Sequence, residues 1–321
     1  MKIARALLAI LAAFASASAA AQAYPAKPIL MIVPLQAGTA VDAVARVIAQ
    51  KMSANMGQPI VVENVVGASG QIGTERIARA APDGYAIGFV NDSILTMLPN
   101  LNPRLPYDPL KDLAPVSRVG GNAFGIAVNP AFPAKSLGEL IAMAKAHPGE
   151  IHFATGGNGS PQHMVMEMLK SAAGADMTHV PYKGAGQAMT DVLGGQVPVL
   201  AQGLGVLNAQ VKAGKLRVLA VTGAARSPLV PDVPTVRGSG YPDFEFVTWF
   251  AVVAPAGTPR AVIDRLNSEI VKAARSADVR DTLAPQGYDI EPGSPERLTE
   301  SIREGLARMG RVVREAGIKA D

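Results

Sequence analysis

The stretch that decides the fold is ILMIVPLQAGTAVDAVARVIAQ, residues 29–50. It begins with an apolar run, Ile29 to Val33, of the length expected for a strand that is buried on both faces. Pro34 ends the strand because proline has no N–H group to donate. Small residues follow, and then a predicted helix that carries Asp42 near its N-terminus. Unpaired N–H groups and the positive end of the helix dipole face such a turn, so residues 36–40 form a candidate anion site. An ordinary strand-to-helix turn is the alternative interpretation.

The same pattern recurs along the first third of the chain. Residues 58–66 and 85–91 are predicted as further strands, and a second small-residue turn, GASGQIG, occupies residues 67–73. A predicted helix separates each strand from the next, and this order is typical of a parallel sheet covered by helices. Such sheets bind ligands outside the carboxyl ends of their strands, where both turns lie. The chain is therefore expected to be an α/β protein.

A third turn of this kind, TGGNGSPQH, occupies residues 155–163 in the middle of the chain. It lies between a predicted strand at 151–154 and a predicted helix at 162–173. Its backbone N–H groups and the hydroxyls of Thr155 and Ser160 are expected to point to one place. Two α/β units with such turns facing one another suggest a receptor that encloses a small ligand between them.

The remaining segments complete the two units. The proline-rich segment 99–115 is expected to be an irregular crossover, residues 124–128 a strand leading out of the first unit, and residues 246–254 a strand leading back. Amphipathic helices are expected at 259–276 and 294–315 and are assigned to the first unit. The other predicted elements are a helix at 136–147, a helix ending at residue 193, and strands at 178–182, 196–201 and 216–222.

The N-terminus has the composition of a secretory signal peptide. Lys2 and Arg5 precede the apolar run ALLAILAAF, and the sequence AQA at 21–23 fits a small-x-small cleavage site. The apolar run is too short to span a bilayer, which requires about 20 residues, so a membrane anchor is the weaker interpretation. We expect residues 1–23 to be removed, the mature chain to begin at Tyr24, and the protein to be located in the periplasm.

The composition argues against a nucleic-acid partner and against stabilisation by disulfides. The chain has 30 basic and 26 acidic residues, and without Lys2 and Arg5 the net charge is only +2. No basic run is interleaved with aromatic residues, so a nucleic-acid partner is not expected. Cysteine is absent, so an exported chain cannot use disulfides. A mature chain of this length can instead build large apolar cores, which we expect in two domains.

Signatures of catalysis are missing from the sequence. The motifs GxSxG, GxxxxGK[ST], HExxH and GxGxxG do not occur, and there is no cysteine nucleophile. His163 and Glu167 are spaced i, i+4 on one predicted helix and could place two metal ligands on one face, but no third ligand is evident. Trp249, the single tryptophan, is expected in the core. We therefore expect no enzymatic activity, no metal and no cofactor.

Motifs spread over the mature chain resemble those of one family. They are, in order, YPAKPILMIVP, QAGTAVDAVAR, GQPIVVENVVGASGQIG, APDGY, LPYDP, TGGNGSPQH, HVPYKGAGQAMTDVLGGQV, AGKLRVLAVT, PDVPT, TWFAVVAPAGTP and VVREAGI. Each is weak alone, but their joint order resembles the Bug family, the solute receptors of tripartite tricarboxylate transporters. The resemblance implies a type II periplasmic-binding-protein fold, in which two α/β domains close like a Venus flytrap on a ligand in the cleft between them. The domains implied are residues 24–123 with 248–321, and residues 124–247.

The resemblance also implies a function without catalysis. Family members bind small organic carboxylates, use no metal, and deliver the ligand to the permease subunits of a tripartite tricarboxylate transporter. We therefore expect a monomeric periplasmic receptor for a small organic carboxylate. The alternatives are a periplasmic sensor that presents its closed form to a signalling partner, and an exported small-molecule hydrolase.

In the family, two turns hold one ligand carboxylate, partly through ordered waters. Their counterparts here are the turn after Val33 and residues 155–160. Lys183 follows a predicted strand and precedes a glycine, so it can aim a charge at an anion, although a solvated loop lysine fits equally well. The expected ligand-binding residues are Leu35, Gln36, Ala37, Gly38, Thr39, Ala40, Asp42, Ser69, Thr155, Gly156, Asn158, Gly159, Ser160, His163, Lys183 and Gln202.

The chain departs from the family pattern at two places. The family usually has VPFPAGG where this chain has VPLQAGT at 33–39, and it often has Phe-Asp where this chain has Ala201-Gln202. Loss of the acid removes a partner for a ligand amine, and loss of the aromatic ring widens the pocket. Gln36, Thr39 and Gln202 add neutral hydrogen-bonding groups. We expect a carboxylate that carries hydroxyl or carbonyl groups, or a bulkier one, and not an amino acid.

Overall fold

The computed structural model describes residues 24–318, so the predicted signal peptide lies outside the described residues. The elements are, in chain order, β1 (Ile29–Val33), α2 (Ala40–Met56), β2 (Ile60–Asn64), η1 (Ala68–Gly70), α3 (Gln71–Ala78), β3 (Ala86–Asn91), η2 (Ser93–Met97), α4 (Leu98–Leu101), β4 (Leu113–Val128), α5 (Leu137–Ala146), β5 (His152–Thr155), α6 (Pro161–Ala173), β6 (Thr178–Pro181), α7 (Ala185–Leu193), β7 (Val199–Gly203), α8 (Leu204–Lys212), β8 (Arg217–Val221), η3 (Arg237–Ser239), β9 (Val247–Pro255), α9 (Arg260–Arg275), α10 (Ala277–Leu283), η4 (Ala284–Gln286) and α11 (Pro295–Glu315).

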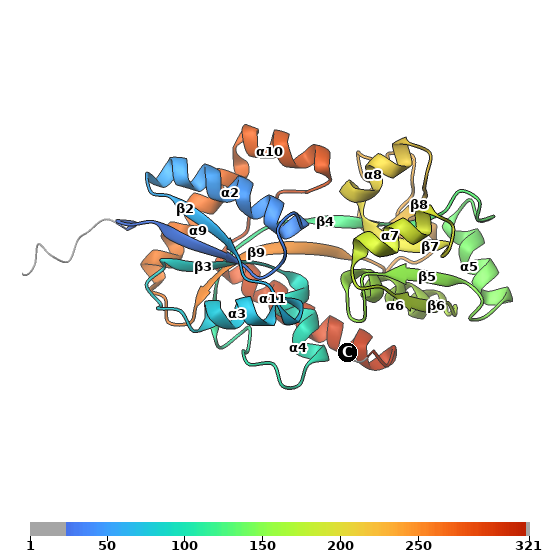
Figure 1. Ribbon diagram of the computed structural model, residues 1–321, viewed down its shortest axis with the longest axis horizontal. Coiled ribbons are helices and arrows are strands. Elements are labelled where there is room, and N and C mark those ends of the chain that lie inside the picture. The colour runs from blue at the N-terminus through green and yellow to red at the C-terminus, as the bar shows by residue number, and fades with distance from the viewer. Residues whose placement is uncertain (1–23, 319–321) are drawn as a thin grey trace, which may run out of the picture.

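The molecule consists of two lobes that lie side by side, with the long strands β4 and β9 running between them (Figure 1). The first lobe contains β1 to β3 with α2, α3, α9 and α10. The second lobe contains β5 to β8 with α5 to α8. The turn that follows β1 lies on the side of the first lobe that faces the second (Figure 1).

The strands form one mixed sheet in the order β2-β1-β3-β9-β4-β7-β5-β6, with β8 pairing to β4. In the first lobe, β1 runs parallel to both β2 and β3, as the alternating strand and helix pattern predicts. In the second lobe, β5 runs parallel to β6 and β7. β9 is antiparallel to both β3 and β4. The expected α/β class is therefore correct.

The apolar run of β1 is buried on both faces of the sheet, as predicted. Ile29, Met31 and Val33 pack with α2 and α9 in one core cluster. Leu30 and Ile32 pack on the other face, with residues of α3 and α11. Alternate side chains of a strand point to opposite faces, so an uninterrupted apolar run is what a sheet covered by helices on both sides requires.

β4 is much longer than the predicted strand at 124–128, since it spans 16 residues. Residues 113–123 pair with β9, whereas residues 124–128 pair with β7 and β8. Pro115 and Gly120 hide the alternating pattern of the first part, and the register of pairing shifts next to both. Gly120 is required there because a Cβ would overlap the backbone carbonyl of Asp289.

Several helical segments were not predicted. α4 begins at Leu98 and extends into the segment 99–115 that was expected to be irregular, while residues 102–112 contain no helix or strand. α8 begins directly after β7, and α10 begins almost directly after α9, so no loop marks these boundaries. Gly205 additionally interrupts the helical pattern at the start of α8.

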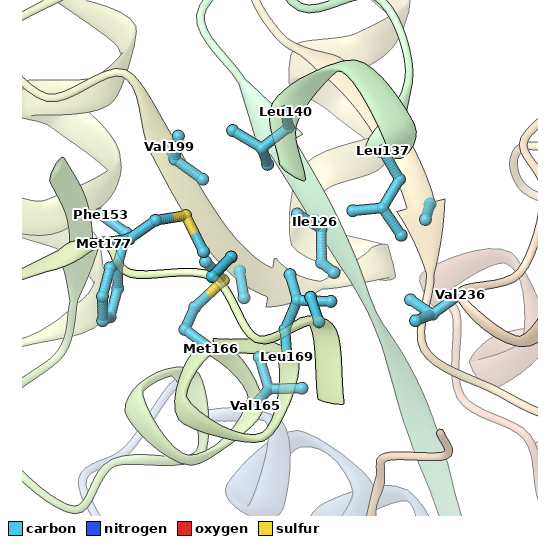
Figure 2. Close-up of a cluster of buried hydrophobic side chains, with 14 of the residues drawn as sticks. Ile126, Leu137, Leu140, Phe153, Val165, Met166, Leu169, Met177, Val199 and Val236 are labelled. Carbon is cyan, nitrogen blue, oxygen red and sulfur yellow. The ribbon is translucent and has the colours of Figure 1, made fainter. Parts of the chain in front are cut away.

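α11 contributes to the apolar cores of both lobes. Leu298 and Ile302 pack in a first-lobe cluster that also holds Trp249, which is buried as predicted. Met309, further along the same helix, packs in the main second-lobe cluster. Figure 2 shows that cluster, in which side chains from β4, α5 and α6, among them Ile126, point toward one another.

Asp92, directly after β3, is an ionisable group inside the first lobe. Its side chain is only 2% exposed, and its Oδ1 atom has no hydrogen-bond partner among the described residues. Burial raises the pKa of Asp92 to about 7, although Arg308 of α11 and the N–H groups of Ser93 and Trp249 oppose the shift. In the folded protein the protonated carboxyl group therefore dominates only below about pH 7.

We expect Asp92→Asn to be more stable than the wild type at pH 8 and to lose this advantage as the pH falls. The folded pKa of about 7 lies above the usual aspartate pKa of 3.8, so the wild type loses stability as pH rises through this window. The full difference corresponds to at most about 4 kcal/mol of unfolding free energy. Urea unfolding of both proteins at several pH values measures it.

The matched control is Asp281→Asn, an exposed position on α10. Its unfolding free energy should differ from that of the wild type by the same small amount at each pH. A stability gap between Asp92→Asn and the wild type that does not change with pH would contradict the expectation.

Candidate functional site

The buried carboxylate of Asp42 stabilises the first turn, residues 34–40. This carboxylate is only 3% exposed and accepts hydrogen bonds from the N–H of Gly38 and from the side chain of Asn64, each at 2.9 Å. Arg46, one turn further along α2, pairs with it at 3.0 Å. Burial alone would raise the pKa of Asp42, but hydrogen bonds from Arg46, Gly38 and Asn64 hold it below its usual value. Asp42 therefore stays ionised and shapes the turn.

The start of α2 offers free donors at this turn. Thr39 caps the helix, and its hydroxyl donates to the carbonyl of Gln36 at 2.8 Å. The N–H groups of Ala37, Ala40 and Val41 have no hydrogen-bond partner within residues 24–318. An anion placed here would meet these donors and the positive end of the α2 dipole.

The second turn, between β2 and α3, lies against the first. Gly73 of α3 packs so closely on Pro34 that a Cβ at this position would lie 2.7 Å from the proline Cβ. Ala68 and Ser69 have positive φ values of 45° and 56°, which are uncommon for residues that carry a Cβ. Ser69 is exposed. The turns after β1 and β2 therefore form one surface at the carboxyl edge of the sheet.

The third turn, between β5 and α6, uses several of its backbone donors internally. The N–H of Gly157 donates to Oγ1 of Thr155 at 3.2 Å. The N–H of Gly159 donates to Nδ1 of His163 at 3.1 Å, and that of Ser160 donates to the carbonyl of Gly157 at 3.2 Å. The expectation that all N–H groups of this turn point to a ligand is therefore wrong for these three residues, because the turn folds back on its own side chains.

Two donors of the third turn remain available. The N–H of Gly156 has no hydrogen-bond partner in the described part of the chain. Ser160 caps α6 by accepting from the N–H of His163 at 3.3 Å, so its hydroxyl hydrogen is free to donate. Thr155, in contrast, is fully buried, and its Oγ1 lies 2.5 Å from Nε2 of His179. Thr155 therefore shapes the turn from within.

α4 contacts the third turn and packs against the main second-lobe cluster. A Cβ on Gly159, which has a φ of +67°, would overlap the side chain of Leu101 at the end of α4. The neighbouring Asn102 donates to the side chain of Gln71, at the start of α3, at 3.0 Å. A continuous chain of contacts therefore links the third turn to the second, and through Pro34 to the first.

The other predicted site residues lie around these turns. Oε1 of Gln202 accepts from Gln162 at 3.3 Å and from the next backbone N–H at 2.9 Å, whereas its Nε2 has no partner within residues 24–318. Lys183 is exposed and forms no ion pair with any described residue. It lies just before α7, whose Ala185 packs on Gly156.

Leu35 packs against the first-lobe cores, and Asn158 is exposed at the tip of the third turn.

A cavity of about 750 Å³ lies along the second half of α6. Its lining includes Lys170, Gly174, Tyr241 and Val312, and no residue of the three turns contributes to it. Its lining begins at Glu167, roughly 9 Å along α6 from the start of the helix at Pro161. The candidate site is therefore defined by its convergent donors and not by the size of a cavity.

The pair His163 and Glu167 is not arranged as a metal site. Nε2 of His163 lies 3.7 Å from the Glu167 carboxylate, which also binds Lys170 at 3.0 Å. No group of three or more His, Asp or Glu side chains in residues 24–318 is placed to hold a metal ion. No helix in the same range combines the length and the apolar character needed to cross a bilayer.

Sequence reasoning missed several residues that support the site. Arg46 follows Asp42 by four residues on one helix, and this spacing is a signal that could have identified the pair. Asn64 ends β2 at the carboxyl edge of the sheet, where polar residues are candidates for such a role. His179 and Leu101 carry no local signal, because they meet the third turn only through the tertiary fold.

Comparison with known proteins places the chain among solute receptors. The family model of the tripartite tricarboxylate transporter family receptor matches residues 44–318. Protein BugT of Bordetella pertussis is 40% identical over 305 residues, which cover 95% of this chain and 94% of BugT. A protein of R. palustris solved with adipate has a TM-score of 0.83 at 30% identity and covers 92% of this chain and 99% of its own. MatC of Rhodopseudomonas palustris, with bound malate, has a TM-score of 0.79 at 31% identity and covers 90% of this chain and 100% of its own.

We expect Asp42→Asn to destabilise the first turn, because it removes the charge that pairs with Arg46 and one acceptor for the N–H of Gly38. Hydrogen bonds to a charged group contribute about 1.5–3 kcal/mol, and the loss of unfolding free energy at pH 7 should fall in this range. The pKa of Asp42 is lowered by folding, so its contribution disappears as the pH falls through the folded pKa. Urea unfolding should therefore show the deficit shrinking from neutral toward acidic pH.

The control for this variant is Asp232→Asn, an exposed aspartate in a loop of the second lobe. It should unfold like the wild type at each pH. An Asp42→Asn protein that is as stable as the wild type at neutral pH would show that the carboxylate does not hold the turn.

Proposed function

Because this chain belongs to the tripartite tricarboxylate transporter receptor family, we propose that it binds a small organic carboxylate between its lobes and delivers it to the membrane permease of such a transporter. The family consists of receptors and not of enzymes, and its members are periplasmic. The proposal includes removal of residues 1–23, a periplasmic location and a monomeric receptor.

One observation carries the proposal. α2 of the first lobe and α6 of the second both begin at turns that keep donors free, and a chain of contacts through Leu101, Gln71 and Pro34 links these turns. Helix N-termini favour anions, and two from separate lobes can meet one carboxylate only when the lobes are together. The relatives solved with adipate and with malate hold dicarboxylic acids, which supports the same class of ligand here.

The remaining polar groups indicate what else the ligand carries. Each helix dipole contributes only about 0.3–1 kcal/mol, so affinity has to come from several hydrogen bonds made together. Gln36 and Nε2 of Gln202 are neutral groups suited to a hydroxyl or carbonyl of the ligand. Thr39 adds less than its sequence position suggests, because its hydroxyl donates to Gln36. We assign Lys183, which lies two residues before the Ala185 that packs on Gly156, to a second carboxylate, and we therefore favour a hydroxy-dicarboxylate such as malate.

Closure of the lobes is the proposed working motion. The moving units are residues 24–123 with 248–321, and residues 124–247. The change of β4 partners after Ala123 supports the first boundary. A ligand shifts the receptor toward the closed form only by its greater affinity for that form. The same closed form would also serve a sensor that docks a signalling partner, which is the second candidate function.

We expect a thermal-shift screen to single out dicarboxylates. Malate at about 100 times its dissociation constant should stabilise the mature protein by about 2.7 kcal/mol, which corresponds to a rise in Tm of several degrees. Adipate should also stabilise it, whereas acetate, glycine and aspartate should have little effect. Stabilisation by amino acids alone, or by none of these compounds, would contradict the proposal.

A pair of matched variants tests the second-lobe half of the site. Ser160 caps α6, and Ser136 caps α5 in the same way, far from the three turns. Each serine-to-alanine change removes a cap that contributes about 1 kcal/mol, so both lower Tm to a similar extent. Ser160→Ala should also weaken malate binding in isothermal titration calorimetry, whereas Ser136→Ala should bind malate like the wild type.

A further variant tests closure. Gly205 of α8, in the second lobe, packs on the backbone carbonyl of Gln286 in η4, which follows α10 of the first lobe. A Cβ on Gly205 would overlap this carbonyl. Gly205→Ala should hold the lobes apart, lower the affinity for malate by about tenfold or more, and leave a larger radius of gyration in small-angle X-ray scattering at saturating malate.

The control is Gly138→Ala in α5, where a Cβ meets only the Ser136 hydroxyl at 3.9 Å. Its malate affinity and radius of gyration should match those of the wild type. Unchanged affinity and dimensions in Gly205→Ala would show that this contact is not part of the ligand-binding form.

A further inference from the structure

Two histidine rings lie stacked beneath the third turn. The rings of His163 on α6 and His179 on β6 have centroids 3.8 Å apart and planes inclined by 14°. Phe153 of β5 stacks on His179 at 5.2 Å. His163 is only 6% exposed, so the pair is an internal support of the turn.

Both ring nitrogens of His163 already have partners. Nδ1 accepts the N–H of Gly159 at 3.1 Å, so this nitrogen carries no proton. Nε2 faces the Glu167 carboxylate at 3.7 Å, and that carboxylate is bound by Lys170 at 3.0 Å. Burial raises the pKa of Glu167, but hydrogen bonds from His163 and Lys170 hold it below its usual value, so Glu167 is an ionised acceptor. This partner fixes the proton of a neutral ring on Nε2.

These internal hydrogen bonds leave only some donors of the third turn available to a ligand. With Gly159 bound to His163 and Gly157 bound to Thr155, the N–H of Gly156 and the hydroxyl of Ser160 are left to face a ligand. Gly159 also packs on Leu101 of α4, so its position affects how α4 contacts the turn.

We propose that His163 is a positioning residue for the ligand: as a neutral ring protonated on Nε2, it holds the N–H of Gly159 inward and so presents Gly156 and Ser160 to the ligand carboxylate. The inference rests on the proposed carboxylate-binding function and deepens it. His163 acts through Gly159, because neither of its nitrogens is left to contact a ligand.

The decisive experiment compares two substitutions in the mature full-length protein. In His163→Asn, Oδ1 occupies the position of Nδ1 and can accept the N–H of Gly159, but the stacking ring is lost. In His163→Phe, the ring that stacks on His179 is kept and the acceptor is lost. Affinities for malate and for adipate are measured by isothermal titration calorimetry, with Tm as the record of stability.

We expect His163→Asn to bind within about threefold of the wild type and His163→Phe to bind about tenfold more weakly or worse, because a buried N–H is left without an acceptor. A role limited to packing predicts the reverse order, since the phenyl ring fills the site better than an amide. Equal binding by the two variants, or tighter binding by His163→Phe, would overturn the inference while leaving the proposed function intact.

A measurement on the wild type covers the case in which a variant fails to fold. Nitrogen NMR of protein labelled with ¹⁵N-histidine reports which ring nitrogen of His163 carries the proton. An unprotonated Nδ1 coupled to the amide of Gly159 is the expected result, and a protonated Nδ1 would overturn the inference without any ligand. A wild type that binds neither acid would instead reject the proposed function, and with it the role of His163 in binding.

Discussion

The antiparallel pairing of β4 with β9 is the constraint on which the rest of the structure depends. β4 pairs with β9 over residues 113–123 and with β7 and β8 over residues 124–128, so a single strand belongs to the sheet of both lobes. These hydrogen bonds determine how the carboxyl edges of the two half-sheets face one another. Without them the turns after β1 and β5 would lie apart, and an anion at either turn would meet only one helix dipole.

Much of the fold could be predicted because its signals are local. The apolar run of β1 and its end at Pro34 are contained in one short stretch of sequence. The first part of β4 could not be predicted, because its partner β9 is far away in the chain and Gly120 is needed for a close backbone approach to Asp289. α8 was missed for a similar reason, since Gly205 serves a contact with Gln286 and weakens the local helical pattern.

Part of the candidate site could likewise be predicted from the sequence, and part could not. Small residues between a strand and a helix mark all three turns, and the position of the turns could be predicted from them. Which donors face outward could not, because this depends on side chains that fold back under the turns. Asp42 and His163 were expected at the ligand, but the structure directs Asp42 to Gly38 and His163 to Gly159. His179 reaches Thr155 only through the pairing of β6 with β5.

The shared position of α11 has a consequence for the order in which the chain can fold. Leu298 and Ile302 complete a core of the first lobe, and Met309 completes the main core of the second. A chain that leaves the ribosome or passes through a membrane N-terminus first therefore lacks part of both cores until its last long helix emerges. Domains usually gain their stability as whole units, so neither lobe can reach full stability early. The C-terminal helix thus delays the completion of both cores until nearly the entire polypeptide is available.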